Sequence, residues 1–305
     1  MMTRKGTLYP FDWLILGFSS LMIGLILVLG RPLSQYLDEL AFYAAMIALS
    51  LLIVRYTDES KNRWHAAVRL LYPVVLFTFF YRETGGLMFL LWPGFFDWQL
   101  TTFEKMIFGV HPTIYIDRHL LSAWANEIFS FSYFSYYLML PGVILPLFFL
   151  RDYKVLKQLL TAVCLTFFIS YIIFFMYPVE GPRWFFAADY LHEIKSPVFR
   201  HLVNIVIAKG AVRGGCMPSS HVAVALTLLF FMLKYYRKFG LVLLPLNIGL
   251  AVGTFWGRFH YVSDVFVGAA IGTFSVLLVW KYYDRWTEPA VRSSVKGQRE
   301  VEHAT

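Results

Sequence analysis

Two short stretches near the C-terminal end carry side chains that could do chemistry: PSSH at residues 218–221 and RFHYVSD at residues 258–264. Each stands where a long apolar run begins, so each can lie at the start of a membrane helix. His260 and Asp264 are four residues apart and therefore share one helix face. An aspartate that accepts a hydrogen bond from the N–H of one imidazole nitrogen leaves the other nitrogen free to attack, which indicates a nucleophilic histidine.

The PSSH stretch favours a helix start, because proline suits the first helical turn and serine is a preferred N-cap. The same helix N-terminus would offer backbone N–H groups to a phosphate, and Ser219 and Ser220 would add hydroxyl donors. His221 could then protonate a leaving oxygen as a general acid. Each feature alone also has a structural explanation: a helix cap for PSSH, and a polar pair or half of a metal site for His260 and Asp264.

Two arginines could hold an anion. Arg183 follows a long apolar run and Arg258 lies two residues before His260, and a planar guanidinium can clamp two phosphate oxygens. Alone, each could equally be an interfacial arginine. Together with the histidines, serines and aspartate they supply a nucleophile, its orienter, an acid and a phosphate clamp, which indicates phosphoryl transfer. The sequence has no Cys/His set with zinc spacing and no glycine-rich phosphate loop, so we expect no metal and no cofactor.

The composition is that of an integral membrane protein. The chain of 305 residues is 58% hydrophobic and only 15% charged, whereas a soluble domain carries about a quarter charged residues. The net charge of +8 is explained by basic cytoplasmic loops, so we expect no nucleic-acid partner. Cys164 lies inside an apolar run and Cys216 just before PSSH, so we expect no disulfide between them.

Apolar runs of about 20 residues, the length that crosses a bilayer, predict an all-α, polytopic transmembrane bundle of about eight spans. The runs lie near residues 12–30, 38–55, 66–81, 126–150, 155–177, 218–236, 240–256 and 262–281. We divide the chain into N-terminal spans with a re-entrant or interfacial region (1–125), a membrane core that carries the catalytic residues (126–284) and a disordered cytoplasmic tail (285–305).

Basic residues orient these spans. Clusters of lysine and arginine precede the first predicted span and follow the second, fourth, sixth and eighth, so eight spans would place every cluster in the cytoplasm. The segments 82–125, 177–217 and 257–258 then fall on the opposite face, beside both motif stretches. The segment 177–217 also carries cations, among them Arg183, that the positive-inside rule does not explain. A site that binds anions on the outer face would explain them.

At these residues the sequence resembles the type 2 phosphatidic acid phosphatase superfamily of membrane lipid phosphatases and phosphotransferases. PSSH matches the family's second motif, P-S-G-H, with Ser220 in place of the glycine. HYVSD matches the end of the third motif, H-x-x-x-D, and the resemblance covers about residues 155–280.

The resemblance implies a metal-independent reaction in two steps through a phosphohistidine. His260 would be the nucleophile, Asp264 its orienter and His221 the acid for the leaving group. The phosphate would be held by Arg183, Ser219, Ser220 and Arg258.

The chain also departs from the family pattern. The serine-arginine pair of the third motif falls on Gly253 and Thr254, so Arg258 is the obvious substitute for the missing arginine. An arginine two residues before the histidine looks like the inositol phosphorylceramide synthase branch. The first motif is altered as well, because Arg183 is followed by tryptophan instead of proline and Met176 stands where the motif's lysine would be.

We therefore expect an enzyme of the plasma or inner membrane whose active site faces the periplasm, exterior or lumen. It would move a phosphoryl group or phospho-headgroup from a lipid to an alcohol, as an inositol phosphorylceramide synthase does, or to water. Expected partners are a lipid phosphate or phospholipid substrate and the bilayer; the oligomeric state stays unknown. A transporter would carry ionisable residues near span centres, but only Arg69 breaks the apolar pattern. A non-catalytic scaffold would keep the motif residues as caps and anchors.

Overall fold

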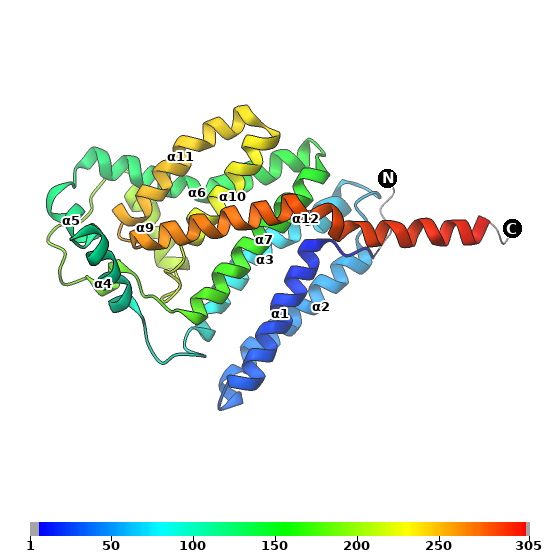
Figure 1. Cartoon of the computed structure of the whole chain (residues 1–305), viewed down its shortest axis with the longest axis horizontal. Helices are drawn as coiled ribbons and strands as arrows, with labels where there is room; N and C mark the ends of the chain where they lie inside the picture. Colours follow the sequence, from blue (N-terminus) through cyan, green and yellow to red (C-terminus); the bar gives the residue numbers. More distant parts are fainter. Residues whose placement is uncertain (1–5, 303–305) are drawn as a thin grey trace.

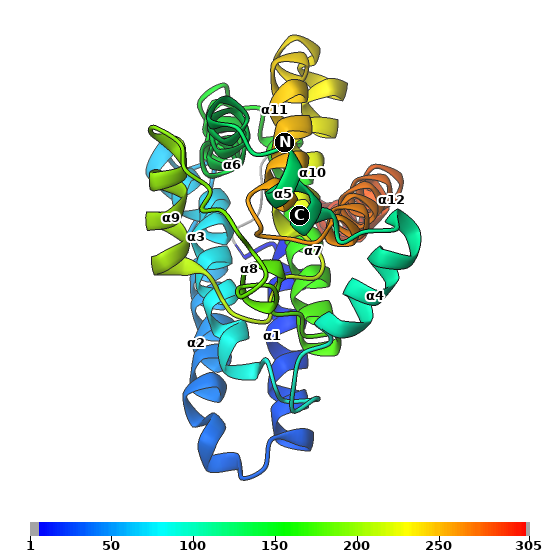
Figure 2. The same cartoon turned by 90° about the vertical axis from the view of Figure 1, so that its left-hand side faces the viewer.

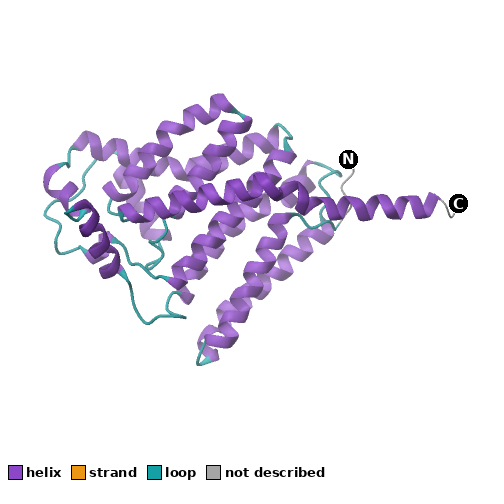
Figure 3. Ribbon diagram, viewed as in Figure 1, coloured by secondary structure: helices purple, strands orange, loops and turns teal. Residues whose placement is uncertain are grey.

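Helices make up the architecture of the chain (Figure 3). The computed structural model describes the backbone of residues 6–302 and the side chains of residues 6–287. Within that range it contains no β-strand, only an isolated bridge between Val179 and Gly215, so the all-α prediction is confirmed. In chain order the helices are α1 (Pro10–Leu29), the 3-10 helix η1 (Leu33–Tyr36), α2 (Leu37–Tyr56), α3 (Arg63–Leu87), α4 (Asp97–Phe108), α5 (Pro112–His119), α6 (Ala123–Phe149), α7 (Tyr153–Met176), α8 (Pro182–Phe185), α9 (Phe199–Gly210), α10 (Ser220–Tyr235), α11 (Arg237–Trp256) and α12 (Val262–Glu302).

The polytopic membrane bundle is also confirmed. Among the described residues, 7 helical segments are long and apolar enough to cross a membrane: α1, η1 with α2, α3, α6, α7, α11 and the part of α12 up to Thr287. The remaining predicted span, 218–236, corresponds to α10, which is apolar but has 16 residues. That length is short of the roughly 20 residues that a full crossing needs.

The bundle places α10 at its centre and the shorter helices α4, α5 and α9 at one end. Helix α10 packs against α6, α7, α11 and α12. Figure 1 shows α4, α5 and α9 at the end of the molecule where α12 begins, far from the C-terminus. Figure 2 looks onto that end and shows α9 and α4 on opposite sides of it. The segments predicted to share the outer face, 82–125, 177–217 and 257–258, therefore meet at the same end of the molecule.

Two glycines let α12 approach α10 closely. A Cβ atom on Gly268 would lie 2.4 Å from the Ser219 carbonyl oxygen, and one on Gly272 would lie 2.3 Å from the Ala223 carbonyl oxygen. Small residues four positions apart permit such close packing between membrane helices. As a result the Ser219 N–H donates to the Asp264 carbonyl oxygen at 3.0 Å, and the two motif stretches start side by side.

The N-terminal spans and the C-terminal half share one hydrophobic core. Its buried members come from α1, α2, α3, α6, α7, α9, α10, α11 and α12, so the division at residue 126 stays a prediction about sequence organisation. Helix α12 continues to Glu302, where the sequence analysis predicted a disordered tail from residue 285. Residues 303–305 of that predicted tail lie outside the described part of the chain.

The exceptional charge noted in the sequence, Arg69, is paired. Its guanidinium donates to both carboxylate oxygens of Asp12 on α1, and also to the Thr7 carbonyl oxygen at 3.0 Å. The Tyr72 hydroxyl donates to the same carboxylate at 2.5 Å. The Arg69 and Asp12 side chains are 3% and 0% exposed, so the pair clamps α1 to α3 and does not line a transport path.

We expect Asp12→Ala to destabilise the bundle without changing the chemistry. Removal of one partner leaves the Arg69 charge buried and unpaired, which costs about 3–5 kcal/mol. Thermal unfolding in detergent measures the loss as a lower Tm. The double variant Asp12→Ala/Arg69→Met is the control, because it removes both charges and should recover much of the stability. An Asp12→Ala protein with an unchanged Tm would contradict the role assigned to the pair.

Candidate active site

The predicted site residues converge around a cavity of about 440 Å³ at the end of the bundle where α10 and α12 begin. Four of them line it: Arg183, Ser220, His221 and His260. Three others, Asp264, Ser219 and Arg258, are not among its lining residues. The remaining wall is largely aromatic and aliphatic and comes from α3, α6, α7 and α9. The cavity therefore joins a polar end to an apolar extension.

His260 lies in the turn between α11 and α12 and is only 5% exposed. Its Nδ1 atom lies 2.8 Å from the Cys216 carbonyl oxygen and 3.4 Å from Asp264 Oδ2. A carbonyl oxygen accepts hydrogen bonds and never donates them, so Nδ1 must carry the ring proton. The neutral imidazole then keeps its lone pair on Nε2, which is the form that a nucleophile needs.

Asp264 is held in place on the first turn of α12. Its Oδ2 atom accepts from the Tyr261 N–H at 2.8 Å as well as facing His260. The side chain is fully buried, and its Oδ1 atom has no hydrogen-bond partner among the described residues. The aspartate thus lies behind the nucleophile, away from the cavity, as an orienting group should.

His221 lies on the first turn of α10, and its ring centroid is 5.8 Å from that of His260. One phosphoryl group in the cavity can therefore contact both imidazoles. The Tyr133 hydroxyl lies 3.3 Å from His221 Nε2. The rings of Tyr136 and Tyr137 stand 4.5 and 6.1 Å from the same imidazole. Three tyrosines of α6 therefore enclose His221, and the polar neighbour of its Nε2 atom is the Tyr133 hydroxyl.

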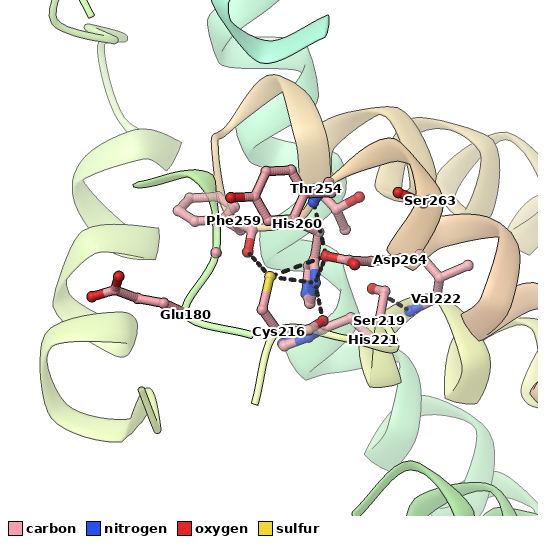
Figure 4. Close-up of polar contacts among 12 residues, drawn as sticks. Glu180, Cys216, Ser219, His221, Val222, Thr254, Phe259, His260, Ser263 and Asp264 are labelled. Carbon is pink, nitrogen blue, oxygen red and sulfur yellow. Dashed lines mark hydrogen bonds and ion pairs between the residues drawn. The ribbon is translucent and has the colours of Figure 1, made fainter. Parts of the chain in front are cut away.

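The two serines of PSSH have different surroundings. Ser219 is the N-cap of α10, and its hydroxyl accepts from the Val222 N–H at 3.4 Å (Figure 4). Ser219 is 0% exposed, so the structural explanation of a helix cap applies to it. Ser220 lines the cavity beside His221 and is the serine that a bound group could reach.

Arg183 reaches the cavity from α8. The segment before it is bound to the chain that leads into α10, since the Val179 N–H donates to the Gly214 carbonyl oxygen and the Cys216 N–H to the Val179 carbonyl oxygen. The Arg183 guanidinium stacks 4.9 Å from the Trp184 ring and has no carboxylate partner among the described residues. Burial lowers the pKa of Arg183, but an arginine stays charged. An unpaired cation beside the histidines can hold an anion.

Arg258 is engaged elsewhere. Its guanidinium donates to Asp117 Oδ1 at 2.5 Å and to the His192 carbonyl oxygen at 2.7 Å, and it lies 3.8 Å from the centroid of the Tyr190 ring. Its backbone has a φ of 65°, an unusual conformation for a side chain other than glycine. Arg258 therefore ties the turn that carries His260 to Asp117 and His192, and it does not line the cavity.

Three carboxylates from α4 and α5 fasten the loops around the cavity. Asp97 accepts from the N–H groups of Glu180 and Gly181 at 2.8 Å and from the Tyr261 hydroxyl at 2.8 Å. Asp117 accepts from Arg258 and from the Leu191 and His192 N–H groups. Glu104 accepts from both the N–H and the hydroxyl of Ser263, at 2.7 and 2.6 Å. Helices α4 and α5 thus hold three segments: the one before Arg183, residues 191–192, and the turn from Arg258 to Ser263 that carries His260.

We expect Glu104→Ala to impair both stability and turnover. The substitution leaves the Ser263 N–H and hydroxyl unpaired at the start of α12, and loss of a helix cap costs about 0.5–2 kcal/mol. Ser263 lies between His260 and Asp264, so we expect the rate to fall by about tenfold, as a misplacement costing about 1.4 kcal/mol would produce. Burial raises the pKa of Glu104, and the bonds from Ser263 oppose that rise.

Glu127→Ala is the matched control for Glu104→Ala. The Glu127 carboxylate accepts from the Val198 and Phe199 N–H groups at the start of α9, so it caps a helix in the same way but makes no hydrogen bond to the described residues of α12. Melting temperature and initial rate are measured for both variants. Equal losses of rate in the two would show that Glu104 has no special link to the His260 turn.

Two further residues beside the His260 turn, Cys216 and Arg200, had no site role in the sequence analysis. Cys216 donates its thiol proton to Asp264 Oδ2 at 3.0 Å and lies 3.6 Å from His260 Nδ1 (Figure 4); burial raises its pKa, and Asp264 adds to the rise. Arg200 of α9 donates to the Gly257 carbonyl oxygen at 3.1 Å and lies 4.9 Å from the Phe259 ring centroid. Burial and the neighbouring arginines lower the pKa of Arg200 to about 10, so it remains a cation that supports the turn.

Comparison with known proteins identifies one family. The family model described as PAP2 superfamily matches residues 98–278, from the second residue of α4 into α12, and all the predicted site residues lie within that range. No curated protein and no solved structure matches the chain. The resemblance to the superfamily that the two motifs indicated is confirmed. The inositol phosphorylceramide synthase-like branch stays a prediction.

Proposed function

Since the chain belongs to the PAP2 superfamily, a family of phosphatases and phosphotransferases, we propose that it moves a phosphoryl group or phospho-headgroup from a membrane lipid to an alcohol, or to water. The reaction would pass through a phosphohistidine on His260. No metal takes part in the steps that we propose.

The observation that carries this proposal is the set of acceptors around His260 Nδ1. The Cys216 carbonyl oxygen at 2.8 Å and Asp264 Oδ2 at 3.4 Å both favour a proton on Nδ1, which leaves Nε2 as the nucleophilic atom. His260 also lines the same cavity as His221 and Arg183. A histidine that served only as a helix-end partner would not need a cavity, a second histidine and an unpaired cation.

The first step would form the phosphoenzyme. Nε2 of His260 attacks the phosphorus, the bond from phosphorus to the leaving oxygen breaks, and His221, which takes up a proton when the anionic substrate binds, gives that proton to the leaving oxygen. Arg183 and the Ser220 hydroxyl would stabilise the equatorial oxygens of the transferring group. Asp264 would stabilise the positive charge that develops on the His260 ring.

The second step would release the group to its acceptor. His221, now neutral, takes the proton of an alcohol or water molecule, whose oxygen attacks the phosphorus. The phosphorus–nitrogen bond breaks and both histidines return to their starting forms. Balance of protons over the two steps needs no further acid or base.

The surroundings of His221 support an alcohol as acceptor. Tyr133, Tyr136 and Tyr137 enclose the imidazole, and the Tyr133 hydroxyl lies 3.3 Å from Nε2. Such a wall leaves less room for bulk water and offers aromatic faces to an organic acceptor. The charge pattern of the loops supports a site on the outer face, because the basic clusters lie at the opposite ends of the predicted spans.

The test is to identify the products made from labelled lipid. Purified protein in mixed micelles receives a lipid extract labelled with phosphorus-32, with and without added polyol alcohols. A new labelled phospholipid would indicate a transferase and free phosphate a hydrolase. Absence of both products, from protein that remains folded, would contradict the enzyme proposal and leave a transporter or scaffold as the alternative.

A further inference from the structure

We propose that Cys216, His260 and Asp264 form an inhibitory site for a thiophilic divalent cation such as Zn²⁺ or Cd²⁺. Whether a cation binds depends only on these three side chains and not on the proposed function. Inhibition by the bound cation rests on the proposed function, in which His260 is the nucleophile.

The three ligand atoms have the spacing of a tetrahedral zinc site. Cys216 Sγ lies 3.0 Å from Asp264 Oδ2 and 3.6 Å from His260 Nδ1, and Nδ1 lies 3.4 Å from Oδ2. Zinc–ligand bonds of about 2.0–2.3 Å at tetrahedral angles place neighbouring ligand atoms about 3.3–3.6 Å apart. Small shifts of the side chains would therefore enclose a cation.

The chemistry of the set also suits a soft cation. A thiolate, an imidazole and a carboxylate are three of the ligands that Zn²⁺ prefers in proteins. The second carboxylate oxygen of Asp264 is buried without a hydrogen-bond partner among the described residues, so it is a further oxygen that could coordinate the cation. Cys216 and His260 line the cavity, which gives a cation a route to the site.

Coordination would disable the nucleophile. A cation on His260 Nδ1 needs the lone pair of that atom, so the ring proton moves to Nε2 and the nucleophilic lone pair is lost. The Cys216 thiol releases its proton to solvent when the thiolate binds. Arg183 lines the same cavity as Cys216 and His260, and its positive charge opposes a bound cation, so we expect reversible binding and not a structural metal.

The binding test uses Cd²⁺ with the purified full-length protein. Thiolate bound to Cd²⁺ gives a charge-transfer band in the ultraviolet, and the titration should reach one cation per chain. Cys216→Ser should remove the band, because serine can keep the hydrogen bond to Asp264 but is not a soft ligand. Cys164→Ala is the control: Cys164 is the other buried free cysteine, and this variant should keep the band. His260→Ala should weaken binding by at least about tenfold.

The inhibition test is made on the same proteins. Cd²⁺ or Zn²⁺ should stop lipid turnover by the wild type and by Cys164→Ala, and a chelator should restore it. Cys216→Ser, compared with its own uninhibited rate, should need at least about tenfold more cation. A band that is absent from the wild type, or that persists in Cys216→Ser, overturns the site. Binding without inhibition overturns the inhibitory role, and a protein without turnover still allows the binding test to decide the site.

Discussion

His260→Ala is expected to lower turnover of lipid phosphate by at least about 10⁴-fold, because removal of a covalent nucleophile removes the reaction path itself. The hydrogen bonds that the His260 side chain makes to described residues are all at Nδ1, with Cys216 and Asp264, so few contacts are lost and the variant should fold. The control is His201→Ala, an exposed histidine on α9 at the same end of the molecule. Normal turnover by His260→Ala would end the assignment of a phosphohistidine.

Asp264→Asn should have a smaller effect than His260→Ala. The Cys216 carbonyl oxygen still accepts from Nδ1 at 2.8 Å, so it keeps the tautomer when the carboxylate is gone. The variant loses the charge that stabilises the imidazolium, and we expect a loss of about 10²-fold. Acid-labile, base-stable labelling of the protein measures the phosphoenzyme directly, and it should be absent from His260→Ala and slow to form in Asp264→Asn.

The sequence predicted the motifs and the end of the bundle where they meet. Both motif stretches begin apolar runs, and the family match confirms the superfamily that they indicated. The helix type and most span boundaries could also be predicted, because membrane helices are recognised from length and hydropathy alone. Helix α10 is the exception, because it is shorter than the predicted span. It begins at the site with Ser220 and His221 and ends at Tyr235, just before α11.

The supporting residues could not be predicted, because their partners are distant in the sequence. Cys216 meets His260 and Asp264 across 44 and 48 positions, and Glu104 meets Ser263 across 159. No local period or motif reports such contacts. The sequence could still have indicated that Glu104 and Asp97 have partners, since carboxylates on a short helix need hydrogen-bond donors once they are buried.

The role of Arg258 shows a second limit. Arg258 was predicted to contact the phosphate, as the substitute for the arginine that the family's third motif would place at position 254. A sequence cannot show that an acidic partner reaches the same guanidinium from 141 positions away, as Asp117 does. Arg183, without such a partner, is the better candidate for the phosphate, although its motif is the more altered of the two.

Arg183→Ala and Arg258→Ala should therefore fail in different ways. Loss of the Arg183 guanidinium removes a charge from the cavity wall, and we expect kcat/KM to fall by about 10²–10³-fold, as loss of one preorganised donor does. Its fold should persist, because the described residues give Arg183 no hydrogen bond or ion pair to lose. Arg183→Lys should recover part of the rate, since lysine restores the charge without the planar fork.

Arg258→Ala should instead lower stability. It leaves the Asp117 carboxylate, which is 0% exposed, without its cation, and breaking such a pair costs about 3–5 kcal/mol. Turnover per folded molecule should fall less than in Arg183→Ala, because the remaining bonds of Asp117 still hold Leu191 and His192. Tm and kcat/KM measured on all three variants separate the two roles. A stable Arg258→Ala protein with a large loss of kcat/KM would instead support the contact between Arg258 and the phosphate that the sequence analysis predicted.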